Sequence, residues 1–316
     1  MDLTGKRIYV AGHTGMAGSA IIRRLASERC EIITATRAKL DLTRQADVET
    51  FLGESKPHIV IVAAARVGGI RANMDFPVDY LVDNLAIAQN LVVGSHKVAV
   101  KKLLMLGSTC IYPRDAKQPM NEEQFLTGPF EPTNEWYALA KTAAIKLCQA
   151  YRTQYGDDYV SIMPTNLYGP GDNYHPVESH VVAALIRKFH EAKANGAREV
   201  VVWGTGAPQR EFLYIDDLAD ACVFVLKNYS DPEILNIGVG RDIAIAEFAR
   251  TVAKVIGFSG TITFDPSMPD GMPRKLVDVT RLNALGWKAK TSLEDGLRQA
   301  YADFLAGGGR NNDIAP

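Results

Sequence analysis

The sequence predicts an α/β protein in which a doubly wound parallel sheet is joined to a smaller C-terminal α/β domain. Three observations lead to this prediction. Short apolar runs rich in β-branched residues alternate with helix-length amphipathic stretches through the first half of the chain. A glycine-rich turn follows the first of these runs directly. After "NLYGPGDN" (166–173) the alternation gives way to glycine and proline punctuation, which indicates a change of architecture.

Five apolar runs are interpreted as the strands of the sheet. They lie at 6–12, 31–37, 58–65, 101–108 and 159–166. Runs such as "IVIVAAA" are apolar at successive positions, which is typical of parallel strands that are buried on both faces. Long helices are expected in the gaps between the runs, notably at 15–28, 84–97 and 136–155.

The change of pattern also divides the chain into two domains. Residues 1–170 are expected to form the sheet domain, to which 212–237 returns, and residues 171–316 the smaller domain. The tail "GGGRNNDIAP" (307–316) is polar and rich in glycine, so it is predicted to be disordered.

The bulk composition favours a soluble globular protein. The chain has 316 residues, of which 47% are hydrophobic and 22% are charged, with a net charge of -1. This balance has no basic excess, so nucleic-acid binding is not expected. The first residues lack a signal-peptide pattern, and no apolar run is long enough to span a bilayer. A cytoplasmic protein that does not bind membranes is therefore expected.

Cysteine and histidine spacing gives no sign of a disulfide or a metal. The four cysteines, Cys30, Cys110, Cys148 and Cys222, are scattered and form no CxxC pair. That spacing fits reduced thiols and argues against both a disulfide framework and a zinc site. The histidines have no HExxH spacing, so no metal is predicted.

The first chemical motif is "VAGHTGMAGSA", in which three glycines follow a strand and open a helix. Glycines at this spacing let the backbone turn tightly and approach a pyrophosphate, whose charge is stabilised at the helix N-terminus. The context predicts a dinucleotide-binding Rossmann domain. The residues of the motif expected to contact the cofactor are Gly12, His13, Thr14, Gly15, Met16, Ala17 and Gly18.

The end of the second strand indicates which dinucleotide is preferred. An NAD-specific enzyme usually places an acid there to bind the ribose hydroxyls. This chain has Thr36 and Arg37 instead, and a guanidinium can pair with the 2′-phosphate of NADP(H). NADP(H) is therefore the predicted cofactor. The alternative interpretation of Arg37 is a solvated loop residue.

Tyr137 and Lys141, in "WYALAK", are four residues apart and so share one face of a helix. An ammonium stabilises a phenolate, so the pair can pass a proton to the oxygen of a carbonyl that a nicotinamide reduces. Ser108 ends the fourth strand and can hold the same oxygen as a second donor. The YxxxK spacing alone is common on helix surfaces, and the glycine turn and Ser108 make it specific.

The chain resembles the extended short-chain dehydrogenase/reductases that act on nucleotide sugars. Besides the motifs above, the resemblance is carried by "AAARVGGIRAN" (63–73), "GSTCIYP" (107–113), "NLYGPGDN" (166–173) and "WGTGAPQREFLYIDDLADA" (203–221). It covers nearly the whole chain and is closest to the family that converts GDP-4-keto-6-deoxy-D-mannose to GDP-L-fucose. Two residues depart from the pattern, Thr14 where relatives commonly have arginine and Thr109 where many have a second serine.

The resemblance implies a bifunctional enzyme that epimerises C3 and C5 of the sugar and then reduces its C4 ketone. It assigns Cys110 as the base and His180 as the acid, beside Ser108 and Tyr137. A modest lowering of the thiol pKa by nearby positive charge would suit Cys110 to this role. The residues alone leave blander interpretations open. Cys110 is also a small apolar filler, and His180 a packing or capping residue with which His175 competes.

The remaining contacts are likewise implied by the resemblance. Further cofactor contacts are expected at Arg37, Asp41, Leu42, Leu106, Gly107, Ser108, Tyr137, Lys141, Pro164, Thr165, Asn166, Leu167 and His180. Contacts to the GDP-sugar are expected at Lys188, Trp203, Arg210 and Asp270. Arg210 suits a diphosphate because its planar fork of donors matches phosphate oxygens. Arg187 competes with Lys188, since neighbouring residues point to different faces of a helix.

A homodimer through the helices at 84–97 and 136–155 is also implied by the resemblance. These stretches have broad apolar faces, which an ordinary helix facing the core of a single chain explains equally well.

Two other functional classes stay open. A nucleotide-sugar 4-epimerase or 4,6-dehydratase would share the glycine turn and the Tyr137 and Lys141 pair. A dehydratase should show an acidic pair where this chain has Thr109 and Cys110, and a 4-epimerase would consume no NADPH. A redox-sensing dinucleotide-binding regulator is the alternative that is not an enzyme, and it would be expected to lack Tyr137 or Lys141.

Overall fold

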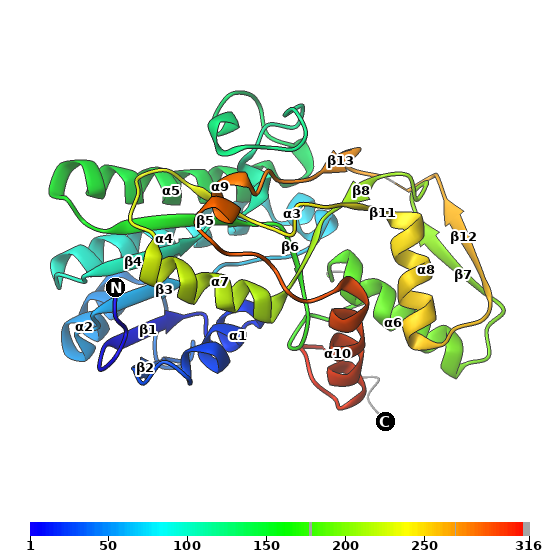
Figure 1. Ribbon diagram of the computed structural model, residues 1–316, viewed down its shortest axis with the longest axis horizontal. Coiled ribbons are helices and arrows are strands. Elements are labelled where there is room, and N and C mark those ends of the chain that lie inside the picture. The colour runs from blue at the N-terminus through cyan, green and yellow to red at the C-terminus, as the bar shows by residue number, and fades with distance from the viewer. Residues whose placement is uncertain (177–178, 269, 312–316) are drawn as a thin grey trace.

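A computed structural model describes residues 1–176, 179–268 and 270–311. Its centre is a parallel sheet of six strands (Figure 1). In spatial order the strands are β10 (Leu235–Ile237), β5 (Tyr159–Pro164), β4 (Lys102–Leu106), β3 (Ile59–Val62), β1 (Arg7–Ala11) and β2 (Glu31–Ile33). The chain runs from β1 outward to β2 and then crosses to β3 on the other side. The predicted doubly wound parallel sheet is therefore confirmed.

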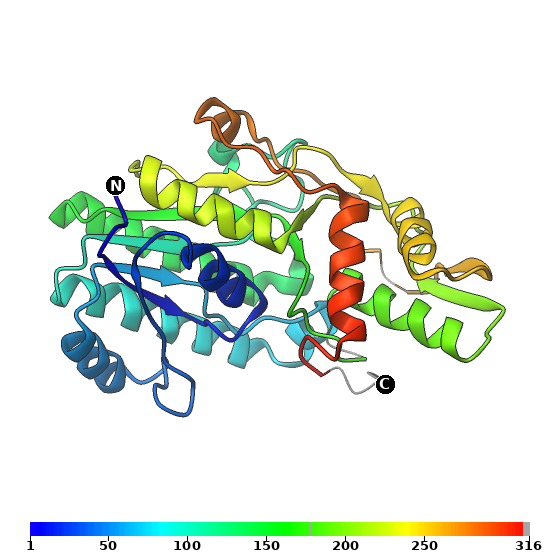
Figure 2. The same ribbon diagram turned by 60° about the horizontal axis from the view of Figure 1, so that its bottom comes forward.

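Helices cover both faces of the sheet, and the strand alternation decides which core each side chain enters. On one face lie α1 (Met16–Leu25) and α7 (Ile215–Asn228), and on the other α2 (Gln45–Ser55), α4 (Pro77–Lys97) and α5 (Glu135–Tyr155). Ile8 and Val10 of β1 pack with the first pair, whereas Tyr9 and Ala11 pack with the second group. Figure 2 shows α1 in dark blue and α7 in yellow-green in front of the sheet.

The smaller domain is built from short sheets and three longer helices, which gather at the right of Figure 1. The helices are α6 (Val181–Ala194), α8 (Ile245–Ile256) and α10 (Leu293–Leu305). The sheets are β7 (Glu199–Trp203) with β12 (Thr261–Asp265), and β11 (Ile243–Ala244) with β8 (Gln209–Arg210) and β13 (Arg274–Lys275). Two further strands, β6 (Asn166–Tyr168) and β9 (Phe212–Tyr214), pair between the domains. Two short α-helices, α3 (Ile70–Asp75) and α9 (Thr280–Ala284), and three 3-10 helices, η1 (Thr109–Ile111), η2 (Glu122–Gln124) and η3 (Pro132–Asn134), complete the described helices.

Several element boundaries differ from those expected. The helix expected at 84–97 begins at Pro77, where proline at the first helical position and Asp79 in the first turn are typical of a helix start. The run at 159–166 is divided between β5 and β6, and the second strand ends at Ile33. Although α4 and α5 are long, no helix among the described residues has the combination of length and apolar composition needed to cross a membrane.

The tail is ordered as far as Asn311. The backbone N–H of Arg310 donates to the carbonyl oxygen of Asp172, and the N–H of Tyr174 donates to that of Arg310, both at 2.8 Å. Asn311 Nδ2 also donates to Asn173 Oδ1 at 2.7 Å. The predicted disorder is therefore wrong for 307–311, because these backbone groups find partners in the loop after β6. The rest of the predicted tail, 312–316, lies outside the described residues.

Candidate active site

The glycine turn after β1 is shaped by close backbone contacts. Gly12 has φ +83°, and a Cβ built on it would lie 2.6 Å from the backbone nitrogen of Ala64. A Cβ on Gly18 would lie 2.1 Å from the carbonyl oxygen of Gly12. Gly15 is the N-cap of α1, so the turn brings the unpaired N–H groups of the first helical turn to the edge of the sheet. This cradle of bare backbone fits the pyrophosphate of a dinucleotide.

The other residues predicted to contact the cofactor follow the ends of neighbouring strands. Their places are the turn after β1 (His13, Thr14, Met16, Ala17), the segment after β2 (Arg37, Asp41, Leu42), the end of β4 (Leu106, Gly107) and the chain from β5 to β6 (Pro164, Thr165, Asn166, Leu167). Because the strands are parallel, their carboxyl ends meet at one edge of the sheet. Arg37 is exposed there. Hydrogen bonds from Thr43 lower the pKa of Asp41.

Ser108 and Cys110 are held by a short 3-10 helix, η1 (Thr109–Ile111), directly after β4. Ser108 Oγ accepts a hydrogen bond from the backbone N–H of Cys110 at 3.4 Å. Cys110 is 6% exposed, and Ile111 beside it is fully buried in a cluster with Tyr112 and Val277. The hydroxyl and the thiol are therefore fixed by a packed segment rather than carried on a free loop.

Tyr137 and Lys141 lie in the first turns of α5, as their spacing predicts. Lys141 Nζ lies 5.7 Å from the ring centroid of Tyr137 and donates a hydrogen bond to the carbonyl oxygen of Leu106 at 2.8 Å. Burial lowers the pKa of Lys141 to about 8. Burial also raises the pKa of the Tyr137 phenol, with smaller contributions from Cys110 and Tyr80. The α5 pair therefore lies beside the thiol of η1.

The pKa of Cys110 differs from the expected direction. Burial raises the pKa of the thiol, and the ammonium of Lys275 opposes this shift more than the Ser108 hydrogen bond or the ammonium of Lys141 does. The lowering of the thiol pKa that would suit Cys110 to its role is not found, because desolvation outweighs the cations. Even so, two cations that favour a thiolate, Lys275 and Lys141, lie beside the sulfur.

His180 lies at the N-cap of α6, and its side chain is exposed. Surrounding protein atoms and the charges of Lys275 and Arg310 nevertheless lower its pKa. The charge of Lys275 acts on both His180 and Cys110, so the two predicted proton-transfer groups share the surroundings of one cation. His175, the competing histidine, lies earlier in the loop, where its backbone N–H donates to Asn173 Oδ1.

The predicted contacts to a GDP-sugar lie in the smaller domain, on α6 (Lys188), β7 (Trp203), β8 (Arg210) and the segment between β12 and β13 (Asp270). Trp203 ends β7 and is 56% exposed. Arg210 donates to the carbonyl oxygen of Asp270 at 3.2 Å, and both carboxylate oxygens of Asp270 accept hydrogen bonds from Thr205. Lys188 Nζ donates to the carbonyl oxygen of Val201 at 2.5 Å, two residues before Trp203. These side chains line one region.

The choice between Lys188 and Arg187 follows from their partners. The guanidinium of Arg187 bonds Glu191 Oε1 at 2.9 Å and the carbonyl oxygen of Tyr174 at 2.8 Å, and its side chain is 12% exposed. It ties α6 to the loop before it. Lys188 faces β7 instead, so the geometry favours Lys188 as the contact.

Comparison with known proteins identifies the family. The model of the NAD dependent epimerase/dehydratase family matches residues 8–238. The chain belongs to this family. A curated relative, the GDP-L-fucose synthase of Sinorhizobium fredii, is 59% identical over 304 residues, which are 96% of this chain and 97% of the relative. GDP-L-fucose synthase 1 of Arabidopsis thaliana is 57% identical over 300 residues, covering 95% and 93%.

A solved structure extends this likeness to three dimensions. It is that of a GDP-L-fucose synthetase from Naegleria fowleri bound to NADP. The TM-score is 0.91 at 28% identity, and the match covers 100% of this chain and 98% of the other. Both domains of this epimerase/dehydratase therefore have counterparts in that protein.

Two charged residues that sequence reasoning missed support the site of this family member. Glu211 is fully buried, and its carboxylate accepts hydrogen bonds from the N–H groups of Val239, Gly240 and Val277 at 2.5, 2.7 and 3.0 Å. It thus joins the segment after β10 to the segment after β13, next to Arg210. Lys275, on β13, faces Cys110. The available signal for Glu211 was a charged residue directly before the apolar run "FLYI".

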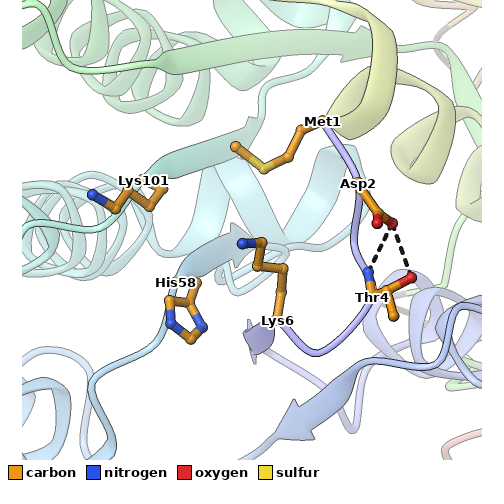
Figure 3. A pocket seen from close by; sticks show the side chains of 6 residues that line it. All are labelled: Met1, Asp2, Thr4, Lys6, His58 and Lys101. Carbon is orange, nitrogen blue, oxygen red and sulfur yellow. Dashed lines mark hydrogen bonds between the residues drawn. The ribbon is translucent and has the colours of Figure 1, made fainter.

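A recess at the opposite edge of the sheet is lined by Met1, Asp2, Thr4, Lys6, His58 and Lys101 (Figure 3). These residues lie at or before the amino ends of β1, β3 and β4. None of the predicted site residues lines the recess. The residues predicted to contact the cofactor lie instead at the carboxyl edge of the sheet.

Proposed function

We propose that the protein uses NADP(H) to convert GDP-4-dehydro-6-deoxy-D-mannose into GDP-L-fucose, by epimerisation at C3 and C5 followed by reduction at C4. The observation that carries this proposal is the Cys110 thiol, buried two residues beyond Ser108 and beside Tyr137 and Lys141. A simple ketone reductase needs only Ser108, Tyr137 and Lys141, whereas the thiol adds a base next to them. The two GDP-L-fucose synthases and the NADP-bound neighbour support the substrate and the cofactor.

Epimerisation follows from the chemistry of the ketone. C3 and C5 both flank C4, so loss of a proton from either carbon places the negative charge on the same oxygen. Ser108 and Tyr137 donate hydrogen bonds to that oxygen. The Cys110 thiolate takes the proton from one face of the ring and becomes a thiol, while His180 gives a proton to the opposite face. Exchange with water then restores the thiolate and the histidine for the second carbon.

Reduction uses the pair on α5. When bound, NADPH supplies the hydride that C4 receives. Tyr137 gives its proton to the developing alkoxide, and Lys141 stabilises the phenolate that remains. Because burial raises the pKa of Tyr137, the phenol keeps its proton until the oxygen beside it becomes negative. Tyr137 therefore holds the C4 oxygen as a hydrogen-bond donor during epimerisation and gives up its proton only in the reduction, with Lys141 beside it.

The test is a product analysis. The purified protein is mixed with GDP-4-keto-6-deoxy-D-mannose and NADPH, and the sugar product is identified by NMR. The L-fucose configuration with one NADPH consumed per sugar is expected. A product with retained configuration at C3 and C5, or turnover without NADPH consumption, would contradict the proposal. The second outcome would show that the sugar is epimerised beside its ketone but not reduced.

We further propose that two copies associate through α4 and α5, which pack against each other. The support is a group of exposed apolar side chains on these helices: Val78, Val82, Trp136 and Leu139, between 41% and 67% exposed. Sedimentation should give a dimer for the natural chain and a monomer for Val82→Glu. A natural chain that sediments as a monomer would refute this assembly.

A cytoplasmic location is proposed on chemical grounds. All four cysteines are free, and the proposed base is one of them. A thiol that must ionise and stay reduced suits a reducing compartment. Cell fractionation with an antibody to the protein tests this location.

A further inference from the structure

Lys275 is held beside the active site by backbone pairing. On β13 it stands opposite Arg210 of β8 in a parallel register. Beyond β13, Met120 donates to the carbonyl oxygen of Leu276, and Asp278 donates to that of Met120, both at 2.8 Å. Backbone hydrogen bonds therefore fix the segment at Lys275 and directly after it, so Lys275 does not lie on a free loop.

Strand alternation directs the Lys275 side chain toward Cys110. Val277, two residues later, is buried in the cluster that contains Ile111 and Tyr112. Residues two apart on an extended strand point to the same side, so Lys275 faces the same segment. Arg274 points to the other side, where it pairs with Asp242 at 2.5 Å.

Among the described residues, few groups act electrostatically on Cys110 and Lys275. Cys110 is faced by the hydroxyl of Ser108, by Tyr137 and Lys141 of α5, and by Lys275. Lys275 is faced by Cys110, Arg210, Glu131 and His180.

Of the two ammonium groups beside the Cys110 thiol, one already has a hydrogen-bond partner. Lys141 donates to the carbonyl oxygen of Leu106. Lys275 is half-buried, and within the described part of the chain its ammonium has no hydrogen bond or ion pair. A half-buried cation without a partner is costly unless a negative charge forms beside it.

We propose that Lys275 is a positioning residue for epimerisation, whose ammonium stabilises the thiolate of Cys110. Its charge offsets the loss of hydration that the buried sulfur suffers on ionisation. Removing the charge leaves Lys141 as the remaining cation beside the sulfur, so a smaller fraction of Cys110 is ionised at neutral pH. The role in epimerisation rests on the function proposed above, whereas the effect on the thiol does not.

The first measurement is alkylation of Cys110 by iodoacetamide as a function of pH, followed by peptide mass spectrometry on the full chain. Lys275→Met should move the midpoint of the alkylation rate to higher pH by about one unit. Below the midpoint, this shift is a tenfold loss of alkylation rate. Lys275→Arg should keep most of the natural rate because it keeps the charge. Arg274→Met is the matched control, with the same change on the other side of the strand, and its midpoint should equal that of the natural chain. An unmoved midpoint in Lys275→Met would overturn the proposal.

The second measurement separates this role from phosphate binding. In heavy water with the keto sugar, Lys275→Met should exchange the C3 and C5 protons about tenfold more slowly at pH 7 and recover at higher pH. If it instead weakens GDP binding in calorimetry while the Cys110 midpoint stays unmoved, Lys275 is a phosphate ligand and the proposal is wrong. If the natural chain exchanges neither proton, the proposed function fails, and alkylation still decides the role of Lys275.

Discussion

Lys141 donates a hydrogen bond to the main-chain carbonyl oxygen of Leu106, at 2.8 Å. This bond connects α5, which carries Tyr137, to the end of β4, which continues into Ser108 and Cys110. One ammonium therefore sets the distance between the reductive pair and the segment with the thiol. Its burial is the cost of that arrangement, and the cost is visible in the pKa of Lys141, lowered from 10.5 to about 8.

Lys141→Met should abolish reduction and change how stability depends on pH. Between pH 8 and 10.5 the unfolded chain binds the proton that the folded chain has lost, so the natural protein gains stability as pH rises. The cost is full below pH 8, where both states are charged. Between pH 7 and 9.5, the free energy of unfolding in urea should therefore rise by about 2 kcal/mol more for the natural chain than for the variant. An equal change in unfolding free energy in the two proteins would contradict the lowered pKa of the buried ammonium.

Cys110→Ser and Tyr137→Phe should damage different steps. Serine is a far weaker base than a thiolate, so Cys110→Ser should stop deuterium uptake from heavy water at C3 and C5. Tyr137→Phe removes the proton donor for the alkoxide and should slow NADPH oxidation about 10²-fold or more. Deuterium uptake should persist in Tyr137→Phe at a reduced rate, because Ser108 still holds the oxygen. Normal uptake in Cys110→Ser would show that another group is the base.

Gly18→Ala should destabilise the cofactor cradle, and Gly53→Ala provides the control. Both glycines lie in helices, where alanine is ordinarily favoured by about 0.5–1 kcal/mol. A Cβ on Gly18 meets the carbonyl oxygen of Gly12 at 2.1 Å, whereas a Cβ on Gly53 meets nothing within 4 Å. We expect Gly18→Ala to cost about 1–3 kcal/mol and to weaken NADPH binding, measured by denaturation and fluorescence titration. Unchanged NADPH affinity in Gly18→Ala would show that the turn does not need this close contact.

The sequence predicts the sheet and the residues after each strand better than it predicts their surroundings. Buried parallel strands are continuous apolar runs, so their ends, and with them Gly12 and Ser108, can be located from the pattern alone. Lys275 could not be located this way, since its approach to Cys110 depends on pairing between distant segments. The raised pKa of Cys110 could not be foreseen for the same reason, because burial of the thiol is a property of the packed fold.

Asp172 provides a last test of how burial acts on a titratable group, in the loop after β6. It is 4% exposed in the loop that the tail covers, and burial raises its pKa to about 7 despite the nearby charge of Arg310. Between pH 4 and 7 the folded chain therefore holds a proton that the unfolded chain has lost, so this group costs stability as pH rises. Asp172→Asn removes the cost and can still accept the hydrogen bond from the N–H of Asn173. Urea unfolding should show a gain of about 1–3 kcal/mol at pH 8 that disappears near pH 4. A gain of equal size at both pH values would mean that the carboxylate is not the source of the cost.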